Sequence, residues 1–365
     1  MDRRGFMLSG LLAIAAAKAK AQSLASEPPS PQPFGRFTQA GALSDNLSTA
    51  EIAERVTDSP APAGPPGRWV TRAMLPIPTS EMGGGTASAG RLHIIGGWVN
   101  RSDHHVYDPA EDRWVRAAPL PRGANHIPVA ADAGRVYALG GFADPNTNPF
   151  TDAYAYDTAE DRWTQIAPLP RARGAGGAAV LEGRIHLVGG AAAPNDERAS
   201  VPWHEVYDPK TDGWSRLRPL PGARDHLGII AYQGHLHVIG GRFNTPAFNT
   251  NLHEVYLPDH DGWEPRAPMP TARSGHALVV YRDRFFAIGG EAGLVVNRKV
   301  VWAKVFGQTE SYDPVTDTWQ DHAPMPTPRH GAGAATIGDS IYVVGGGAVA
   351  GGAVQAAANE AFALV

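Results

Sequence analysis

Six prolines introduce six similar stretches of the chain, and a charged residue stands three positions after five of them. The prolines are Pro78, Pro121, Pro170, Pro221, Pro270 and Pro326, and the residues three positions further on are Glu81, Ala124, Arg173, Arg224, Arg273 and Arg329. If these stretches surround one axis at equal height, four guanidinium groups and one carboxylate converge there. Because a guanidinium group binds a carboxylate through two parallel hydrogen bonds, this ring predicts a site for an anionic ligand.

Further polar side chains follow this ring. Asn125 and His126, Asp225 and His226, and His330 stand one and two positions deeper. We predict that Asp225, His126 and His226 help to bind the ligand. The imidazoles of His126, His226 and His330 could also converge on a metal ion, because histidines from adjacent strands can share one. That alternative stays open, but our interpretation assigns neither a metal nor a cofactor.

The chain behind these residues is repetitive. A Gly-Gly pair ends an apolar run six times, at intervals of 44 to 56 residues, and the first glycines are Gly96, Gly140, Gly189, Gly240, Gly289 and Gly345. A tyrosine follows five of the pairs, and a tryptophan stands seven residues beyond each tyrosine. These aromatic residues are Tyr107 and Trp114, Tyr156 and Trp163, Tyr207 and Trp214, Tyr256 and Trp263, and Tyr312 and Trp319. Such self-similarity predicts a repeat architecture.

This pattern resembles the Kelch repeat and extends from Trp69 to Val365. The resemblance implies an all-β, six-bladed propeller with four antiparallel strands in each blade. Six glycine pairs are followed by only five tryptophans, and Trp69 precedes the first pair. We therefore expect an N-terminal strand to complete the last blade and close the ring, which removes exposed strand edges.

The resemblance also offers a structural role for the arginines. Kelch repeats often carry Pro-x-x-Arg for packing, with the guanidinium group paired to a neighbouring blade. Four glutamates stand two residues before the third-strand aromatic residue and are possible partners: Glu205, Glu254, Glu310 and Glu360. Ligand binding and packing both remain open for the arginines at this point.

Residues after two glycine pairs extend the list of candidates. Arg242 and Asn244 resemble a Gly-Gly-Arg-x-Asn segment of the Kelch adaptors of oxidative-stress ubiquitin ligases, which implies binding of acidic peptides. Glu291 and Arg298 resemble the Gly-Glu…Arg segment of periplasmic N-acetylneuraminate epimerases, which makes them the catalytic candidates of a sugar mutarotase. Galactose oxidase shares the repeat, but its tyrosine–cysteine cross-link cannot form in a chain without cysteine, which argues against a metal-dependent oxidase.

These patterns predict a binding protein whose arginine-lined axial mouth recognises an anionic small molecule, a glycan or an acidic peptide. A sugar mutarotase is the alternative function, and a protein partner is a further option. The net charge of −4 gives no support for nucleic-acid binding.

The first residues predict export. Arg3 and Arg4, followed by Phe6, precede a short apolar run and resemble a bacterial twin-arginine signal. The run is too short to span a bilayer, so we expect no transmembrane span, and a small-residue cleavage site ends at Ala21. We expect a signal peptide over residues 1–21, a Pro/Ser-rich linker over 22–67 and the propeller over 68–365, in the periplasm or secreted.

Overall fold

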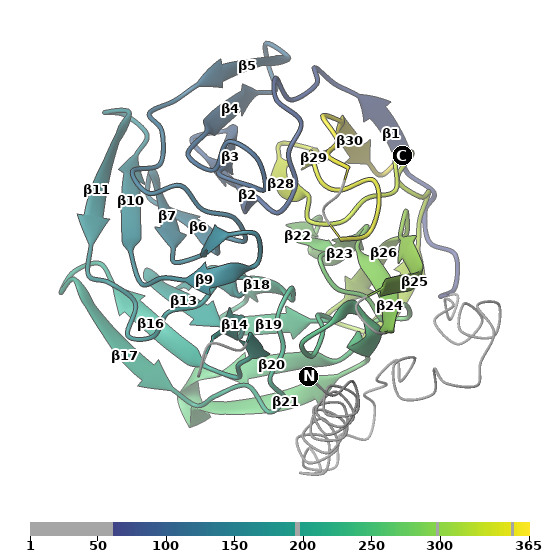
Figure 1. Cartoon of the computed structure of the whole chain (residues 1–365). Coiled ribbons are helices and arrows are strands. Elements are labelled where there is room, and N and C mark those ends of the chain that lie inside the picture. Colours follow the sequence, from purple (N-terminus) through teal and green to yellow (C-terminus); the bar gives the residue numbers. More distant parts are fainter. Residues whose placement is uncertain (1–60, 194–197, 297–298, 352–353) are drawn as a thin grey trace, which may run out of the picture. The chain divides into compact units, whose positions relative to one another are not determined.

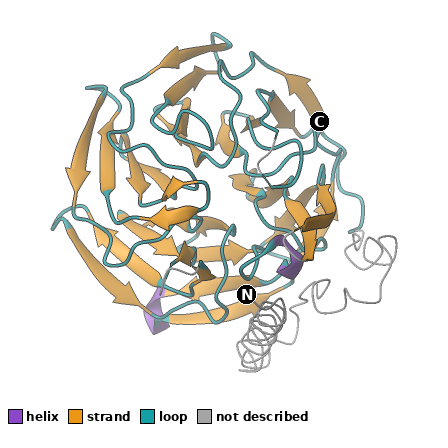
Figure 2. Ribbon diagram, in the orientation of Figure 1, coloured by secondary structure: helices purple, strands orange, loops and turns teal. Residues whose placement is uncertain are grey.

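The computed structural model of the chain describes residues 61–193, 198–296, 299–351 and 354–365. In these ranges, six four-stranded antiparallel sheets form the blades of a propeller around a common axis (Figure 1, Figure 2). The predicted fold is thereby confirmed. The predicted signal peptide and most of the predicted linker, residues 1–60, lie outside the described residues, and the location of the protein stays a prediction. No helix within the described ranges is long and apolar enough to cross a membrane.

Each blade runs outward from a first strand at the axis. Blade one consists of β2 (Gly83–Ser88), β3 (Arg91–Ile95), β4 (His104–Asp108) and β5 (Arg113–Arg116). Blade two consists of β6 (Val129–Asp132), β7 (Arg135–Leu139), β10 (Ala153–Asp157) and β11 (Arg162–Ile166). Blade three consists of β12 (Gly177–Leu181), β13 (Arg184–Val188), β16 (His204–Asp208) and β17 (Gly213–Leu217).

Blades four and five repeat this order, and blade six combines strands from both ends of the described chain. Blade four consists of β18 (Gly228–Tyr232), β19 (His235–Ile239), β20 (His253–Leu257) and β21 (Gly262–Arg266). Blade five consists of β22 (Ala277–Tyr281), β23 (Arg284–Ile288), β26 (Thr309–Asp313) and β27 (Thr318–Asp321). Blade six consists of β28 (Gly333–Ile337), β29 (Ser340–Val344), β30 (Asn359–Ala363) and β1 (Arg68–Thr71).

Loops between the second and third strands carry short hairpins, and two loops form 3-10 turns. The hairpins are β8 (Phe142–Asp144) with β9 (Thr147–Pro149), β14 (Ala191–Ala192) with β15 (Ala199–Ser200), and β24 (Glu291–Val296) with β25 (Lys299–Val305); the turns are η3 (Pro246–Phe248) and η4 (Pro258–His260). Because strands alternate in direction, these hairpins lie on the face where the first strands begin.

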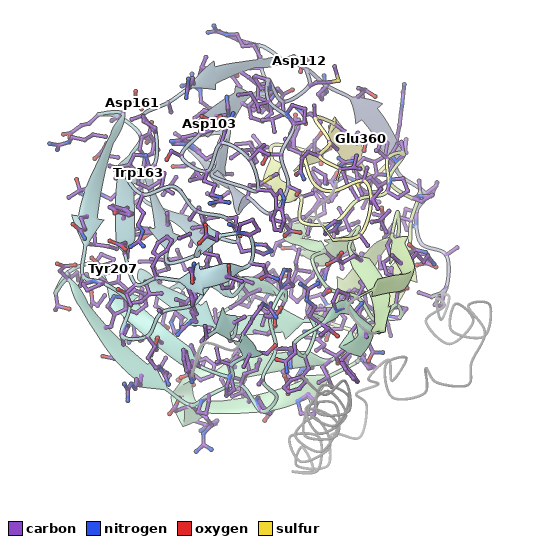
Figure 3. All side chains as sticks on the ribbon, viewed as in Figure 1. Asp103, Asp112, Asp161, Trp163, Tyr207 and Glu360 are labelled. Atoms are coloured by element: carbon purple, nitrogen blue, oxygen red, sulfur yellow. The ribbon has the colours of Figure 1, made fainter. Side chains whose placement is uncertain are left out.

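The repeated tyrosine and tryptophan fasten each blade to the segment that enters it. In blade two, the Trp163 indole N–H donates to the Ala118 carbonyl at 2.9 Å, and the Tyr156 hydroxyl donates to Asp161 at 2.7 Å. The same Asp161 oxygen accepts the backbone N–H of Ala118 at 2.7 Å. Figure 3 shows Asp161 and Trp163 toward the outer part of this blade. The aromatic signature is therefore a requirement of blade packing.

The glycine pairs fit the second strand of one blade against the opening of the next. In blade three, Gly189 and Gly190 have φ of 65° and 102°. The Gly190 N–H donates to the Arg224 carbonyl at 3.0 Å, and a Cβ on Gly189 would lie 2.6 Å from the same oxygen. The other five pairs make the same bond at 2.8–3.0 Å. Both the conformation and the close approach require glycine.

An N-terminal strand closes the ring, as predicted. β1 pairs antiparallel with β30, and Trp69 lies opposite Phe362 with ring centroids 5.1 Å apart. The segment before β1 continues this contact on the neighbouring blade, where the Gly64 N–H donates to the Asp321 carbonyl at 2.7 Å. The last residues of the predicted linker thus lie along β27.

Candidate functional site at the propeller axis

Six residues at the openings of the first strands form a closed ring of backbone hydrogen bonds, which we call the axial ring. Each backbone N–H donates to the carbonyl of the preceding member at 2.7–2.9 Å, and φ lies between 52° and 62° at every member. The members, in blade order, are Glu81, His126, Ala175, His226, Gly275 and Gly331. The ring therefore presents six equivalent backbone positions at the axis.

Three blades place reactive side chains where glycine is the least strained residue. A left-handed backbone costs a residue with a Cβ about 1–2 kcal/mol. Blades five and six avoid this cost with glycine, yet blades one, two and four carry Glu81, His126 and His226. Since all six positions have the same backbone, the fold does not need these side chains. Reactive residues in strained conformations are typical of functional sites.

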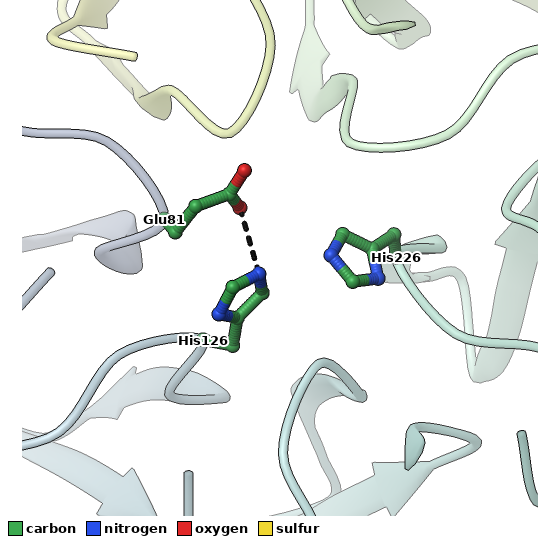
Figure 4. A group of neighbouring side chains, drawn as sticks. All are labelled: Glu81, His126 and His226. Atoms are coloured by element: carbon green, nitrogen blue, oxygen red, sulfur yellow. Dashed lines mark ion pairs between the residues drawn. The ribbon is translucent and has the colours of Figure 1, made fainter. Parts of the chain in front are cut away.

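The three side chains point toward one another (Figure 4). His126 Nε2 lies 3.2 Å from Glu81 Oε2, and the His126 and His226 ring centroids are 4.8 Å apart. Each of the three residues is 7% exposed. A Cβ on Gly331 would lie 2.6 Å from the Glu81 carboxyl carbon, so the glycine there leaves room for this carboxylate.

The residue before each histidine holds its Nδ1 atom. The Asn125 amide group donates to two backbone carbonyls, so Asn125 Oδ1, 2.6 Å from His126 Nδ1, accepts the Nδ1 proton. His226 Nδ1 donates to Asp225 Oδ1 at 2.5 Å. In the neutral imidazoles, both Nε2 atoms therefore carry their lone pairs toward the axis.

Arg242, Glu291 and His330 surround this centre. Arg242 donates to Glu291 Oε1 at 2.5 Å, and its other terminal nitrogen lies 3.0 Å from His226 Nε2. His330 Nε2 lies 3.0 Å from Glu81 Oε1 and 3.4 Å from Glu291 Oε2. The centre is thus a compact mixture of carboxylates, imidazoles and one guanidinium group.

A second set of contacts holds Asp225 behind His226. The Asp225 carboxylate accepts from Arg198 at 2.7 Å and from the Ser200 hydroxyl. The Asn244 carbonyl accepts from Arg198 at 2.7 Å, and Asn244 Oδ1 accepts the Ser200 N–H at 2.8 Å. The contacts of Asn244 therefore join two loops behind the centre.

Burial and neighbouring charges set the protonation of the centre. Burial alone raises the pKa of a carboxyl group, but contacts with His126 and His330 hold the pKa of Glu81 well below its usual range. Burial lowers the pKa of His330, yet Glu291 and Glu81 outweigh this effect and raise it to about 9. Burial and the adjacent guanidinium group lower the pKa of His226 to about 4.

The four arginines of the predicted ring are buried and paired, which corrects the expectation that they line the axis. Each donates to a third-strand glutamate and to a second-strand carbonyl, and none is more than 2% exposed. Each pair lies within one blade rather than between neighbours. The pairs are Arg173–Glu205, Arg224–Glu254, Arg273–Glu310 and Arg329–Glu360. Their charges are neutralised inside the blades and do not repel one another at the axis.

The alignment on proline predicted Glu81 at the level of these arginines, and the structure corrects this. Leu75, buried like the apolar residue before each equivalent proline, precedes Pro76, so Pro76 rather than Pro78 is the equivalent proline. Thr79 therefore takes the arginine position, and its carbonyl accepts the N–H of the sixth glycine pair. Glu81 stands two residues further on, in the axial ring.

Of the remaining candidates, Arg242 and Glu291 lie together at the centre and Asn244 behind it, whereas Arg298 lies outside the described residues. The predicted pairing of Glu291 with Arg298 stays a prediction. Arg198 and Ser200 were not singled out, because no residue pattern marks them and only the fold brings their hairpin against Asp225.

The chain belongs to the Kelch-repeat family. The profile of the KLHDC2/KLHL20/DRC7 Kelch-repeats domain matches residues 85–290, which is more than half of the chain, and the Kelch motif matches residues 272–326.

Individual relatives share the repeat and the fold. Kelch-like protein terF of Aspergillus terreus is 34% identical over 261 residues, which are 67% of this chain and 54% of terF. Human Kelch-like protein 35 is 47% identical over 156 residues, 42% of this chain and 25% of the relative. The chain thus spans about half the length, or less, of these curated relatives. The structure of YjhT matches with a TM-score of 0.67 at 16% identity, covering 78% of this chain and 95% of YjhT, and shows the same fold.

Proposed function

We propose that this propeller is a binding protein and that it holds a small, oxygen-rich anionic ligand, such as an acidic sugar, at the axial centre. The observation that carries the proposal is the occupancy of the axial ring: Glu81, His126 and His226 stand in strained conformations that Gly275 and Gly331 fill without strain. Reactive side chains kept at such positions are accounted for by a ligand rather than by the fold.

The chemistry of the centre indicates the class of ligand. Imidazole and guanidinium groups donate to carboxylate and hydroxyl oxygens, and Glu81 and Glu291 accept from hydroxyl groups. Trp98, which is half-buried, lies beside His126 with ring centroids 6.1 Å apart and provides an aromatic surface next to these polar groups. A sugar acid combines the hydroxyl groups, the carboxylate and the apolar ring face that such a surface suits.

A thermal-unfolding screen of the full chain tests the proposal. Sialic acid, uronic acids, neutral sugars and acidic peptides are compared, each with and without added Zn²⁺. A ligand at a hundred times its dissociation constant adds about 2.7 kcal/mol of stability. We expect one anionic class to raise the unfolding midpoint, and the double variant His126→Ala/His226→Ala to abolish this shift.

The control for the screen is His260→Ala, which removes an exposed histidine from the opposite face of the propeller. This variant is expected to respond to ligand as the unmodified chain does. An equal response in the double axial variant would contradict the proposed site, and no response to any compound would contradict the proposed ligand class.

Sugar mutarotation remains the alternative function. It needs an acid–base pair beside the sugar, and the axial centre contains carboxylates and imidazoles within hydrogen-bond reach of one another. Anomer exchange of any stabilising sugar, followed by nuclear magnetic resonance, separates the two functions: accelerated exchange indicates the enzyme, and unchanged exchange indicates binding alone.

A further inference from the structure

We propose that the axial centre binds one divalent transition-metal ion of the Zn²⁺ class through Glu81, His126 and His226. These residues offer one ligand atom each, and the three atoms lie within 4.8 Å of one another. Two imidazole nitrogens and one carboxylate oxygen form a ligand set that suits zinc. This inference goes beyond the ligand proposal and does not depend on which organic molecule binds.

The separation of the three atoms is compatible with one ion. Bonds of about 2.1 Å in tetrahedral geometry place ligand atoms about 3.4 Å apart. His126 Nε2 and Glu81 Oε2 already lie 3.2 Å apart. The remaining contraction would have to come from the His226 side chain, because the hydrogen-bonded axial ring holds its backbone.

The orientation of the imidazoles is the strongest argument. Metal-binding histidines usually donate their other ring N–H to a carboxylate, an amide oxygen or a backbone carbonyl, which fixes the ring and its tautomer. His126 donates from Nδ1 to Asn125, and His226 donates from Nδ1 to Asp225. Both Nε2 lone pairs are thereby directed to the axis, where His126 Nε2 faces a carboxylate oxygen. In the neutral imidazole this nitrogen and the carboxylate oxygen, 3.2 Å apart, are two electron-rich atoms that a cation can bridge.

A contact between Arg242 and His226 competes with metal binding. One terminal nitrogen of Arg242 lies 3.0 Å from His226 Nε2 and uses the same lone pair. Arg242 also contacts Asp225 and Glu291, which retain its guanidinium group when the ion takes Nε2. We therefore expect Arg242 to weaken metal binding.

Three protein ligands leave a coordination position open. In zinc sites of this kind, the fourth position holds water or an oxygen of the bound molecule. The ion would thus provide the positive charge that the buried arginines do not, and an anionic ligand would bind to it directly.

Titration of the metal-free full chain with Co²⁺ and Zn²⁺, without any organic ligand, tests the proposal. We expect one ion per chain, measured by the visible absorption of bound Co²⁺ and by calorimetry with Zn²⁺. His126→Ala and His226→Ala are each expected to weaken binding at least tenfold. Both variants are expected to fold, because Ala175 occupies the same ring position in blade three.

Two comparisons make the outcome decisive. His260→Ala is expected to bind as the unmodified chain does, and Arg242→Met is expected to bind Zn²⁺ more tightly because the competing guanidinium group is gone. Binding that persists unchanged in both axial histidine variants, or no saturable binding in any chain, would overturn the metal site. Either result leaves the metal-free arm of the ligand screen as a separate test of the proposed function.

Discussion

Arg224 and Glu254 illustrate how a charged residue serves the fold at the scale of single side chains. Both are buried, and the guanidinium group donates to the carboxylate at 2.5 Å. Blade two fills the two corresponding positions with Ala124 and Tyr154 instead. The repeat thus contains, in its own sequence, an uncharged replacement for the ion pair.

We predict that Arg224→Ala lowers the free energy of unfolding by about 3–5 kcal/mol, because it leaves the Glu254 carboxylate buried without its partner. Adding Glu254→Tyr copies blade two and should restore most of the loss. Urea unfolding followed by circular dichroism measures both values. A double variant no more stable than the single one would show that blade four cannot accept the uncharged pair.

The same residues show what sequence reasoning could and could not predict at this scale. The spacing identified four arginines and their four glutamates, but spacing does not say whether a guanidinium group points to the axis or into its blade. That direction follows from the third strand, which brings Glu205 and its equivalents under the arginines. Glu81 was misplaced because two prolines lie close together and only burial of Leu75 identifies the equivalent one.

At the scale of strands, three blades link their second and third strands through a pair of buried histidines. The hydrogen-bonded pairs are His93–His104, His186–His204 and His237–His253, with nitrogens 2.8–3.0 Å apart. Burial lowers the pKa of His93 to about 4 and the pKa of His237 to about 3. The pKa values of the other four members are lowered as well, so all six imidazoles are mostly neutral in the folded protein in mild acid.

This neutrality predicts a loss of stability in mild acid. In the unfolded chain the same imidazoles take up protons below a pKa of about 6.5, so their contribution is complete above that pH and falls toward pH 4. The double variant His237→Phe/His253→Thr copies Phe286 and Thr309 of blade five and removes two of these groups. We expect the free energy of unfolding of this variant to fall less steeply between pH 6 and pH 4.5 than that of the unmodified chain. The two slopes should differ by up to about 2.7 kcal/mol per pH unit.

Urea unfolding at several pH values measures this slope for the variant and the unmodified chain. The comparison is internal to each protein, so a general stability difference between the two chains does not affect it. Equal slopes would mean that these histidines take up protons in the folded protein as readily as in the unfolded chain, contrary to the prediction.

At the scale of the whole propeller, the number of blades and the closing strand could be predicted because both depend on residue types that the geometry requires. Each blade needs one glycine pair and one tryptophan for a backbone contact. Because six glycine pairs are followed by only five tryptophans, the sequence indicated that Trp69 completes the last blade. The axial ring could not be found in this way. Its members share a backbone conformation and a hydrogen-bond position but no residue type.

The seam gives the last prediction. In blade two, a short turn joins β10 to β11, whereas β1 and β30 of blade six come from opposite ends of the described chain and no turn joins them. When β1 opens, no turn ties it to β30, whereas β11 stays tied to β10 through its short turn. The contacts of residues 61–66 with β27 oppose this disadvantage, so we expect residues 61–71 to open as one unit.

Hydrogen exchange of the backbone amides measures this opening directly. We predict that the amides of Arg68–Thr71 exchange at least tenfold faster than those of Arg162–Ile166, the equivalent strand of blade two, although Trp69 and Trp163 make the same indole hydrogen bond. Equal protection of the two strands would show instead that the closing strand opens only with the whole ring. In that case the seam would be as cooperative as the hairpin-linked blades, and the contacts of residues 61–66 would compensate fully for the missing turn.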